Sequence, residues 1–342
     1  MLYRGIQTRS LFTTATRLST TGGTYQVFDR SIKLKQRERA ATNEESGMVE
    51  YIRDEVARRT IERLAFLKNN FTSTMDFGCN SGNLAKQLCE VNPDDDFRWK
   101  DDKALVKSKI QKLYMVDSSE SMLYKNQGGK ADHEMNIERI VTDEEQYSHP
   151  KLTQPDQFDL IVSNLSLHWV NDLPSVFSKL YNSLKPNSCF VGSIFGGDTL
   201  FELRTSLQLA EQERNGGISP RVSPFVGSAD VGSLMQKAGF QMLTIDVEEI
   251  VVDYPDVFAL MTDLQLMGES NSNLSTPPKL SKDMLLALQP IYYALHADPK
   301  TGHLPATFRF VFMIGWKPGQ NFPEPAKRGS GTVKLGDALE QS

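Results

Sequence analysis

The chain has few cysteines and no long apolar run. Its 342 residues include three cysteines, Cys79, Cys89 and Cys189, and no two of them form a Cys-x-x-Cys pair. An odd number without such a pair argues against a disulfide framework and against a thiolate zinc site. No uncharged run approaches the roughly 18 apolar residues of a membrane-spanning helix, so any membrane contact is expected to be peripheral.

An excess of positive charge is also missing. The chain has 38 basic and 43 acidic residues, and its net charge is -5. The basic residues form no patch after residue 40, so no nucleic-acid partner is expected. With 24% charged and 39% hydrophobic residues, the composition is that of an ordinary globular protein.

The first 28 residues contain no acid at all. They carry Arg4, Arg9 and Arg17 among many serines and threonines, with scattered apolar positions. This composition is typical of a mitochondrial transit peptide. A disordered basic tail is the alternative. The sequence therefore predicts a mitochondrial protein whose leader spans residues 1–28.

Apolar and β-branched runs alternate with helical stretches through the rest of the chain. An amphipathic helix is predicted over residues 48–68, from apolar residues at helical spacing. Seven strands are predicted at residues 72–77, 112–116, 139–141, 158–164, 189–195, 244–253 and 307–316. Such alternation favours an α/β fold, a doubly wound, mostly parallel seven-stranded sheet with helices on both faces.

The pattern predicts a single folded domain at residues 71–317. Residues 29–70 precede it as a basic segment and helix, and residues 318–342 follow as a loosely ordered tail. Two stretches, residues 92–111 and 271–281, interrupt the alternation. Both are expected to be surface excursions, because neither composition can bury much apolar area.

A glycine-containing loop, DFGCNSG at residues 76–82, follows the first predicted strand and leads into a helix at residues 83–90. Glycine allows the backbone to approach a ligand closely, and the helix start offers free N–H groups. A glycine pair alone is weak evidence, and its place between strand and helix matters more. The candidate cofactor residues here are Asp76, Gly78, Asn80 and Gly82.

Acids follow the next two strands. Asp117 ends the second strand, where a carboxylate can accept two hydrogen bonds from a ribose diol, and Ser118 lies beside it. An N-cap is the structural alternative for Asp117. Asp143 and Glu144 follow the third strand. They could bond the exocyclic amine of adenine, or they could be solvated loop acids.

The fourth strand ends at Asn164, with His168 and Trp169 close behind. Ligands of open α/β sheets bind at the carboxyl ends of strands, so these residues should border the pocket. His168 could act as an acid or base near neutral pH. The structural interpretation, that His168 and Trp169 shape the pocket wall, is favoured for both.

Two acids follow the fifth strand, in GGDTLFELR at residues 196–204. Asp198 is placed to cap the next helix, and Glu202 lies one turn further on. An acidic pair facing the pocket would suit an arginine guanidinium, which pairs well with carboxylates. The alternative is that both acids simply favour the positive end of a helix.

Taken in order, these elements resemble the class I S-adenosylmethionine-dependent methyltransferases, so the domain is expected to be methyltransferase-like. The likeness is closer over FDLIVSNLSLHWVNDLP, GGDTLFELRTSLQLAEQERNGGISPRVSPF, MTDLQLMGESN and FRFVFMIGWK. These runs resemble the mitochondrial complex I assembly factor 5 family, protein-arginine hydroxylases that act on the PSST iron–sulfur subunit of NADH:ubiquinone oxidoreductase. The resemblance extends from VFDRSIKLKQRERAA to RGSGTVKLGDAL.

This resemblance implies roles for particular residues. Asp76, Gly78 and Gly82 would hold the methionine end of S-adenosylmethionine, Asp117 its ribose, Asp143 and Glu144 its adenine, and Asn164 would close the floor. Asn80 departs from the pattern by replacing a second glycine, and asparagine tolerates a left-handed backbone less freely than glycine. The implied partners are a PSST-type subunit and other complex I assembly intermediates, in the matrix or on the matrix face of the inner membrane.

The chemistry of hydroxylation does not follow from the residues. It usually requires iron held by two histidines and a carboxylate. The five histidines include no His-x-Asp or His-x-x-x-His arrangement, so the oxygen-activating metal is unknown. His168, Asp198 and Glu202 are the catalytic candidates. Two other hypotheses stay open: methyl transfer to a carboxylate or amide, and a non-catalytic assembly chaperone.

Overall fold

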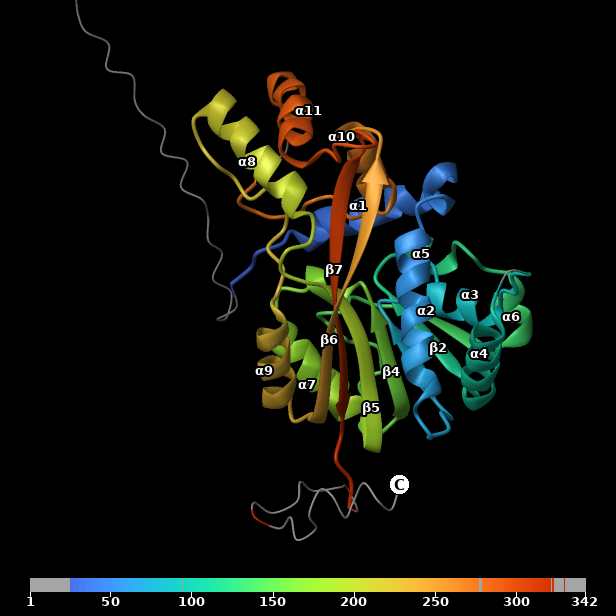
Figure 1. The fold of residues 1–342 in the computed structure, drawn as a ribbon. Coiled ribbons are helices and arrows are strands. Elements are labelled where there is room, and N and C mark those ends of the chain that lie inside the picture. Colours follow the sequence, from blue (N-terminus) through green and yellow to red (C-terminus); the bar gives the residue numbers. More distant parts are fainter. Residues whose placement is uncertain (1–24, 94, 277–278, 321, 323–328, 330–342) are drawn as a thin grey trace, which may run out of the picture.

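The structure is a computed structural model that describes residues 25–93, 95–276, 279–320, 322 and 329. One seven-stranded sheet organises it, with strand order β3-β2-β1-β4-β5-β7-β6 (Figure 1). The strands are β1 (Thr74–Phe77), β2 (Leu113–Asp117), β3 (Ile137–Val141), β4 (Phe158–Asn164), β5 (Leu184–Phe195), β6 (Gln241–Tyr254) and β7 (Leu304–Trp316). β7 pairs antiparallel with both β5 and β6, and the other strand pairs are parallel, which confirms the predicted mostly parallel sheet.

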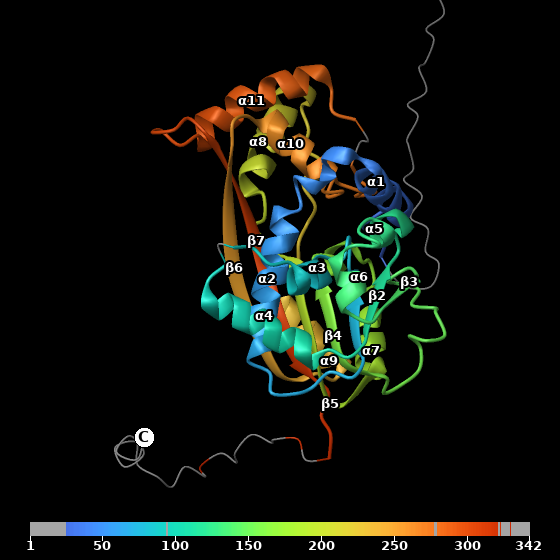
Figure 2. The same ribbon diagram turned by 90° about the vertical axis from the view of Figure 1, so that its right-hand side faces the viewer.

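Helices cover both faces of this sheet (Figure 2). On one face lie α2 (Tyr51–Ala65), α3 (Asn83–Cys89) and α4 (Phe97–Lys109), which bury an apolar core against β2, β4 and β5. On the other face lie α7 (Leu173–Ser183) and α9 (Ser228–Ala238). Two short helices, α5 (Glu120–Tyr124) and α6 (Lys130–Glu134), connect β2 to β3. The predicted doubly wound arrangement is confirmed.

A third group of helices packs where β6 and β7 extend beyond the other strands (Figure 1). It comprises α8 (Phe201–Asn215), α10 (Val257–Leu266) and α11 (Lys282–His296). These helices share an apolar cluster with the strand ends, including Leu207, Leu288 and Phe308. The group borders the carboxyl edge of the sheet, where ligands bind in this class of fold.

The segment at residues 92–111 is not the surface excursion that its composition predicts. It contains α4, and the side chains of Trp99 and Val106 are buried in the core shared with α2. Val106 lies seven positions after Trp99, which places the two side chains on one helix face. Lys103 and Lys109 on the same helix are also buried, because long basic side chains can lay their aliphatic stems along apolar surface.

The basic segment before α2 forms a helix that the sequence did not predict, α1 (Arg30–Thr42). Asp29 caps it by accepting hydrogen bonds from the N–H groups of Ser31 and Ile32. A short 3-10 helix, η1 (Glu44–Gly47), connects α1 to α2. The predicted leader lies outside the described residues up to residue 24, as does most of the predicted tail after residue 317. Within the described ranges no helix is both long and apolar enough to cross a membrane.

Candidate functional site

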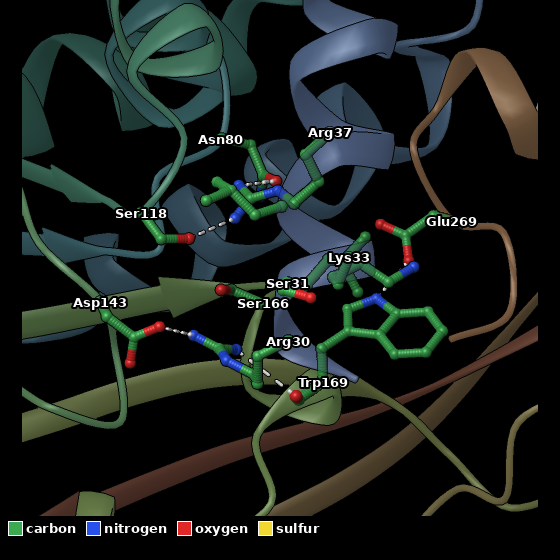
Figure 3. Close-up of a pocket in the computed structure, with 12 residues that line it drawn as sticks. Arg30, Ser31, Lys33, Arg37, Asn80, Ser118, Asp143, Ser166, Trp169 and Glu269 are labelled. Atoms are coloured by element: carbon green, nitrogen blue, oxygen red, sulfur yellow. Dashed lines mark hydrogen bonds and ion pairs between the residues drawn. The ribbon is translucent and has the colours of Figure 1, made fainter. Parts of the chain in front are cut away.

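A pocket lies at the carboxyl ends of β1, β2 and β4, beneath α1 (Figure 3). From α1 it is lined by Arg30, Ser31, Lys33, Leu34 and Arg37. From the loops that follow the strands and α10 it is lined by Asn80, Ser118, Asp143, Leu165, Ser166, Trp169 and Glu269. Four predicted site residues, Asn80, Ser118, Asp143 and Trp169, therefore share one cavity.

The predicted glycine loop wraps around this pocket with three residues in left-handed conformations. Gly78, Asn80 and Gly82 have φ angles of 69°, 54° and 82°. The Asn80 side-chain amide donates to the carbonyls of Gly78 and Asn164, both at 3.2 Å. The asparagine that replaces a glycine of the methyltransferase pattern is thus fixed in a left-handed backbone by its own side chain.

Gly78 is expected to be the least replaceable residue of this loop. A Cβ atom there would lie 2.1 Å from the Ser166 hydroxyl oxygen. We expect Gly78→Ala to lower the free energy of unfolding by about 2 kcal/mol, from overpacking and backbone strain together. Chemical denaturation measures this loss. Gly197→Ala is the matched control, because a Cβ there meets no atom within 4 Å. Equal costs for the two variants would contradict the expectation.

Asp76, at the end of β1, is buried and poorly paired. Only 1% of its surface is exposed, and its Oδ2 atom has no hydrogen-bond partner among the described residues. Burial raises the pKa of this carboxyl to about 8. The side chain is therefore suited to accept a proton or to pair with an incoming amino group.

Asp117 is fully buried at the end of β2, and α1 engages it directly. Its Oδ1 accepts from the Ser119 N–H at 2.8 Å, and its Oδ2 accepts from the Asn80 N–H at 2.9 Å and from Arg37 at 2.6 Å. Burial raises the pKa of Asp117, and the Arg37 guanidinium opposes that shift. The helix after β2 is capped by Ser119, so the alternative role of Asp117 as an N-cap is wrong.

Asp143 and Glu144 are held in the same way by Arg30. One guanidinium nitrogen of Arg30 bonds Asp143 at 2.9 Å and also bonds Glu144. Burial raises the pKa of Asp143, but the Arg30 charge outweighs it, so the pKa is lowered overall. Glu144 also accepts from the Ser118 hydroxyl at 3.1 Å. These two residues are therefore not solvated loop acids, because Arg30 of α1 pairs with both carboxylates.

The other side of the pocket is built around a carboxylate that the sequence analysis missed. Glu269 follows α10, and its Oε2 accepts from the Trp169 indole N–H at 2.7 Å and lies 3.2 Å from His168 Nε2. Its Oε1 accepts from Arg53 at 2.9 Å. Burial raises the pKa of Glu269, but His168, Arg53 and Lys33 lower it well below its usual range. Glu269 lies in MTDLQLMGESN, one of the runs that resemble the assembly factor family. That resemblance was the available sequence signal for this residue.

Trp169 lines the pocket wall, as the structural interpretation predicts, whereas His168 lies beside Trp169 and is not among the lining residues. Both are buried, and their rings lie 5.3 Å apart. Burial lowers the pKa of His168. Asn164 lies at the end of β4, where its Oδ1 accepts from the hydroxyls of Thr60 and Ser193 at 2.9 and 3.0 Å.

Asp198 and Glu202 do not form the acidic pair expected to face the pocket. Asp198 is exposed, pairs with Arg309 and caps no helix, since α8 starts after Leu200. Glu202 is buried and accepts from the Thr307 hydroxyl and, at 3.2 Å, from the Thr307 N–H. The hypothesis of a guanidinium-binding pair at these positions is wrong, because each carboxylate is committed to β7.

No donor set for a metal comes together in the described ranges. Nowhere among those residues do three or more His, Cys, Asp or Glu side chains converge in a way that could hold an ion. His168 and Glu269 are neighbours, but they lack a third ligand of these types. The described residues therefore do not fit an oxygen-activating metal.

Comparison with known proteins places this chain within a family. A family model described as "Methyltransferase domain" matches residues 48–245. Human "Arginine-hydroxylase NDUFAF5, mitochondrial" is 40% identical over 319 residues, which cover 93% of this chain and 85% of that protein. A "Malonyl-[acyl-carrier protein] O-methyltransferase" from Methylovorus sp. is 28% identical, over 77% of this chain and 81% of that protein.

Solved structures show a more distant similarity. A putative methyltransferase from Bacillus halodurans superposes with a TM-score of 0.48 at 14% identity, over 77% of this chain and 99% of that chain. The strand order and the methyltransferase-domain match agree with a class I methyltransferase fold. From its sequence identity and coverage, this chain belongs to the mitochondrial arginine-hydroxylase NDUFAF5 family.

Proposed function

We propose that this chain is a mitochondrial assembly factor that hydroxylates an arginine side chain of the PSST-type subunit of complex I. The 40% identity to human arginine-hydroxylase NDUFAF5 supports the reaction class. The observation in the site that carries the proposal is the buried Glu269 carboxylate beside the Trp169 ring, where the Lys33 ammonium lies 3.3 Å from the ring centroid. The matrix, or the matrix face of the inner membrane, is the proposed location.

The glycine loop and the acids after β2 and β3 carry groups whose chemistry suits S-adenosylmethionine. Gly78 lets the backbone pass close to a ligand, Asp117 offers a carboxylate to a ribose diol, and Asp76 has an unpaired oxygen for an amino group. Asp143 and Glu144 would border the adenine. Because Arg30 and Arg37 hold three of these carboxylates, binding requires α1 to move.

Bound S-adenosylmethionine would supply an activated methyl group beside the substrate pocket. The chain's own residues bind and orient the reactants: Asp117 and the loop hold the nucleoside, and Trp169 and Glu269 border the adjoining space. Hydroxylation replaces a C–H bond by C–OH: one atom of dioxygen enters the product and the other leaves as water, with two electrons and two protons supplied from outside this chain, and the methyl group is not consumed. Closure of α1 over the pocket would keep water from the reacting carbon.

Mass spectrometry of the PSST-type subunit tests the proposed function. In a strain that lacks this protein, we expect the arginine of the subunit to be unmodified, lighter by one oxygen atom than in the parent strain. Expression of the intact chain should restore it, and Asp117→Asn should not, since the ribose contact is weakened. An unchanged hydroxyarginine in the deletion strain would contradict hydroxylation. Normal complex I assembly with Asp117→Asn and without hydroxyarginine would show that assembly depends on a separate chaperone role and not on the hydroxylation.

Methyl transfer is a second candidate, favoured by the methyltransferase-domain match over residues 48–245. Incubation of the purified chain with methyl-labelled S-adenosylmethionine and the PSST-type subunit or an acyl carrier protein measures it directly. Label on a carboxylate or amide of either acceptor would support this candidate. Its absence, together with loss of hydroxyarginine in the deletion strain, would leave hydroxylation as the function.

A further inference from the structure

Helix α1 faces the pocket mainly with cations: Arg30, Lys33 and Arg37 line it, beside Ser31 and Leu34. Arg30, Lys33 and Arg37 are spaced three and four residues apart, so they lie on one helix face. The buried residues of this helix are Lys33, Arg37 and Ala40. The contacts of α1 are mainly ion pairs and hydrogen bonds, with little apolar burial. A ligand that offers the same charges can therefore compete for the same partners.

Lys33 lies in a cage of groups that bind organic cations. Its ammonium nitrogen is 3.3 Å from the centroid of the Trp169 ring. It donates to the carbonyl of Gly268 at 3.2 Å and to the carbonyl of Ser270. Figure 3 shows Lys33, Trp169 and Glu269 together, on the side of the pocket away from Asp143. An aromatic face, two carbonyls and a nearby carboxylate form the cation cage.

Residues other than Lys33 hold the members of the cage in place. The Glu269 carboxylate is fixed by Trp169, His168 and Arg53, and Arg53 also donates to the carbonyl of Met267. Phe28 packs edge-on against the Trp169 ring, with centroids 5.2 Å apart. The ring face and the carboxylate are therefore held in position by residues other than the cation they surround.

Lysine is a poor match for this cage. Burial lowers the pKa of Lys33 to about 7, so its charge is incompletely held near neutral pH. A guanidinium stays charged under these conditions, stacks flat on an indole ring and donates several hydrogen bonds in one plane. The same carbonyls and carboxylate would satisfy those additional donors.

We propose that the cation cage formed by Trp169, Glu269 and the carbonyls of Gly268 and Ser270 binds the guanidinium of the substrate arginine, and that Lys33 occupies it until substrate arrives. This inference rests on the proposed hydroxylase function and deepens it by naming the substrate-binding residues. It assigns arginine recognition to residues other than Asp198 and Glu202. One helix covers both subsites, since Lys33 fills the cage while Arg37 holds Asp117.

Calorimetric titration with Nα-acetyl-L-arginine amide tests the cage in the full chain. Lys33→Ala is expected to bind this probe about tenfold more tightly than the unaltered protein, because the competing cation is gone. Lys33→Met, matched in length but uncharged, should shift affinity in the same direction. Lys35→Ala is the matched control: the residue lies on α1 but is exposed, so affinity should not change. Adding Glu269→Gln to Lys33→Ala should abolish the gain.

The uncharged analogue Nα-acetyl-L-citrulline amide separates charge recognition from shape. It should not bind any of these variants measurably. Equal affinity for the arginine and citrulline probes, or no gain in both Lys33 variants, would overturn the cage. Such a result with hydroxyarginine still lost in the deletion strain would reject the cage and keep the hydroxylase. Tight arginine binding with hydroxyarginine retained would reject the hydroxylase and keep the cage.

Discussion

Replacing Arg37 by methionine is expected to lower the free energy of unfolding by about 3–5 kcal/mol, the largest effect that we expect from a single substitution. Arg37 and Asp117 pair at 2.6 Å, and their side chains are 8% and 0% exposed. Removal of the guanidinium leaves a carboxylate with two backbone N–H groups but no opposite charge. Urea denaturation with an unchanged m-value measures the loss.

Arg39→Met provides the matched control for this experiment. Arg39 lies on the same helix but is exposed, so its replacement should change stability by less than about 0.5 kcal/mol. The double variant Arg37→Met/Asp117→Asn should recover much of the loss, since it removes both charges of the pair. An equally small loss of stability from Arg37→Met and Arg39→Met would show that the Arg37–Asp117 pair contributes nothing to stability.

The same substitution should have the opposite effect on ligand binding. Arg37 occupies the carboxylate proposed to hold the cofactor ribose, so Arg37→Met should bind S-adenosylmethionine more tightly than the unaltered protein. A destabilised protein with stronger binding would identify α1 as a cover over the cofactor site. Weaker binding would mean that Arg37 helps to hold the ligand.

Asp76→Asn is expected to stabilise the protein by about 2–4 kcal/mol at pH 8. The pKa of Asp76 is about 8 in the folded chain, because of burial, and about 3.9 when unfolded. Between these values the folded state binds more protons, so the Asp76 contribution to stability falls as pH rises from about 4 to about 8. Asparagine has nearly the same shape and carries no charge to bury.

Thermal or chemical unfolding of both proteins between pH 5 and pH 8 measures this difference. The stability gained by Asp76→Asn should grow with pH across the range. Asp159→Asn is the control, because Asp159 pairs with Lys185 at 3.0 Å and accepts from the Ser73 N–H, so that substitution should cost stability. A gain independent of pH would mean that Asp76 is ionised throughout.

The sheet was predictable from the sequence because its strands are local apolar runs. The predicted strand at residues 158–164 matches β4 in full, and the other six overlap β1, β2, β3, β5, β6 and β7. The segment at residues 92–111 was misjudged because two buried side chains, Trp99 and Val106, were outweighed by its Asp and Lys content. Composition averages over a helix, whereas burial depends on one face.

The acids of the site were predictable, but their partners were not. Asp117 and Asp143 follow strands in the order that the fold requires. Their partners on α1 are 80 and 113 residues away in sequence, and the helix has no apolar stripe that would reveal its docking. Glu269 was missed for the same reason: Arg53, His168 and Trp169 reach it from other parts of the chain.

The attachment of the residues before α1 limits where a leader can be removed. The Asn171 side chain accepts from the N–H groups of Val27 and Phe28 and donates to the Phe28 carbonyl, and the Asp29 N–H donates to the Ser272 carbonyl. Cleavage after residue 28 would delete the first three of these hydrogen bonds and the ring packed on Trp169. The predicted leader boundary at residue 28 is therefore at odds with these contacts, whereas removal of a leader at or before residue 26 would keep all of them and leave α1 anchored.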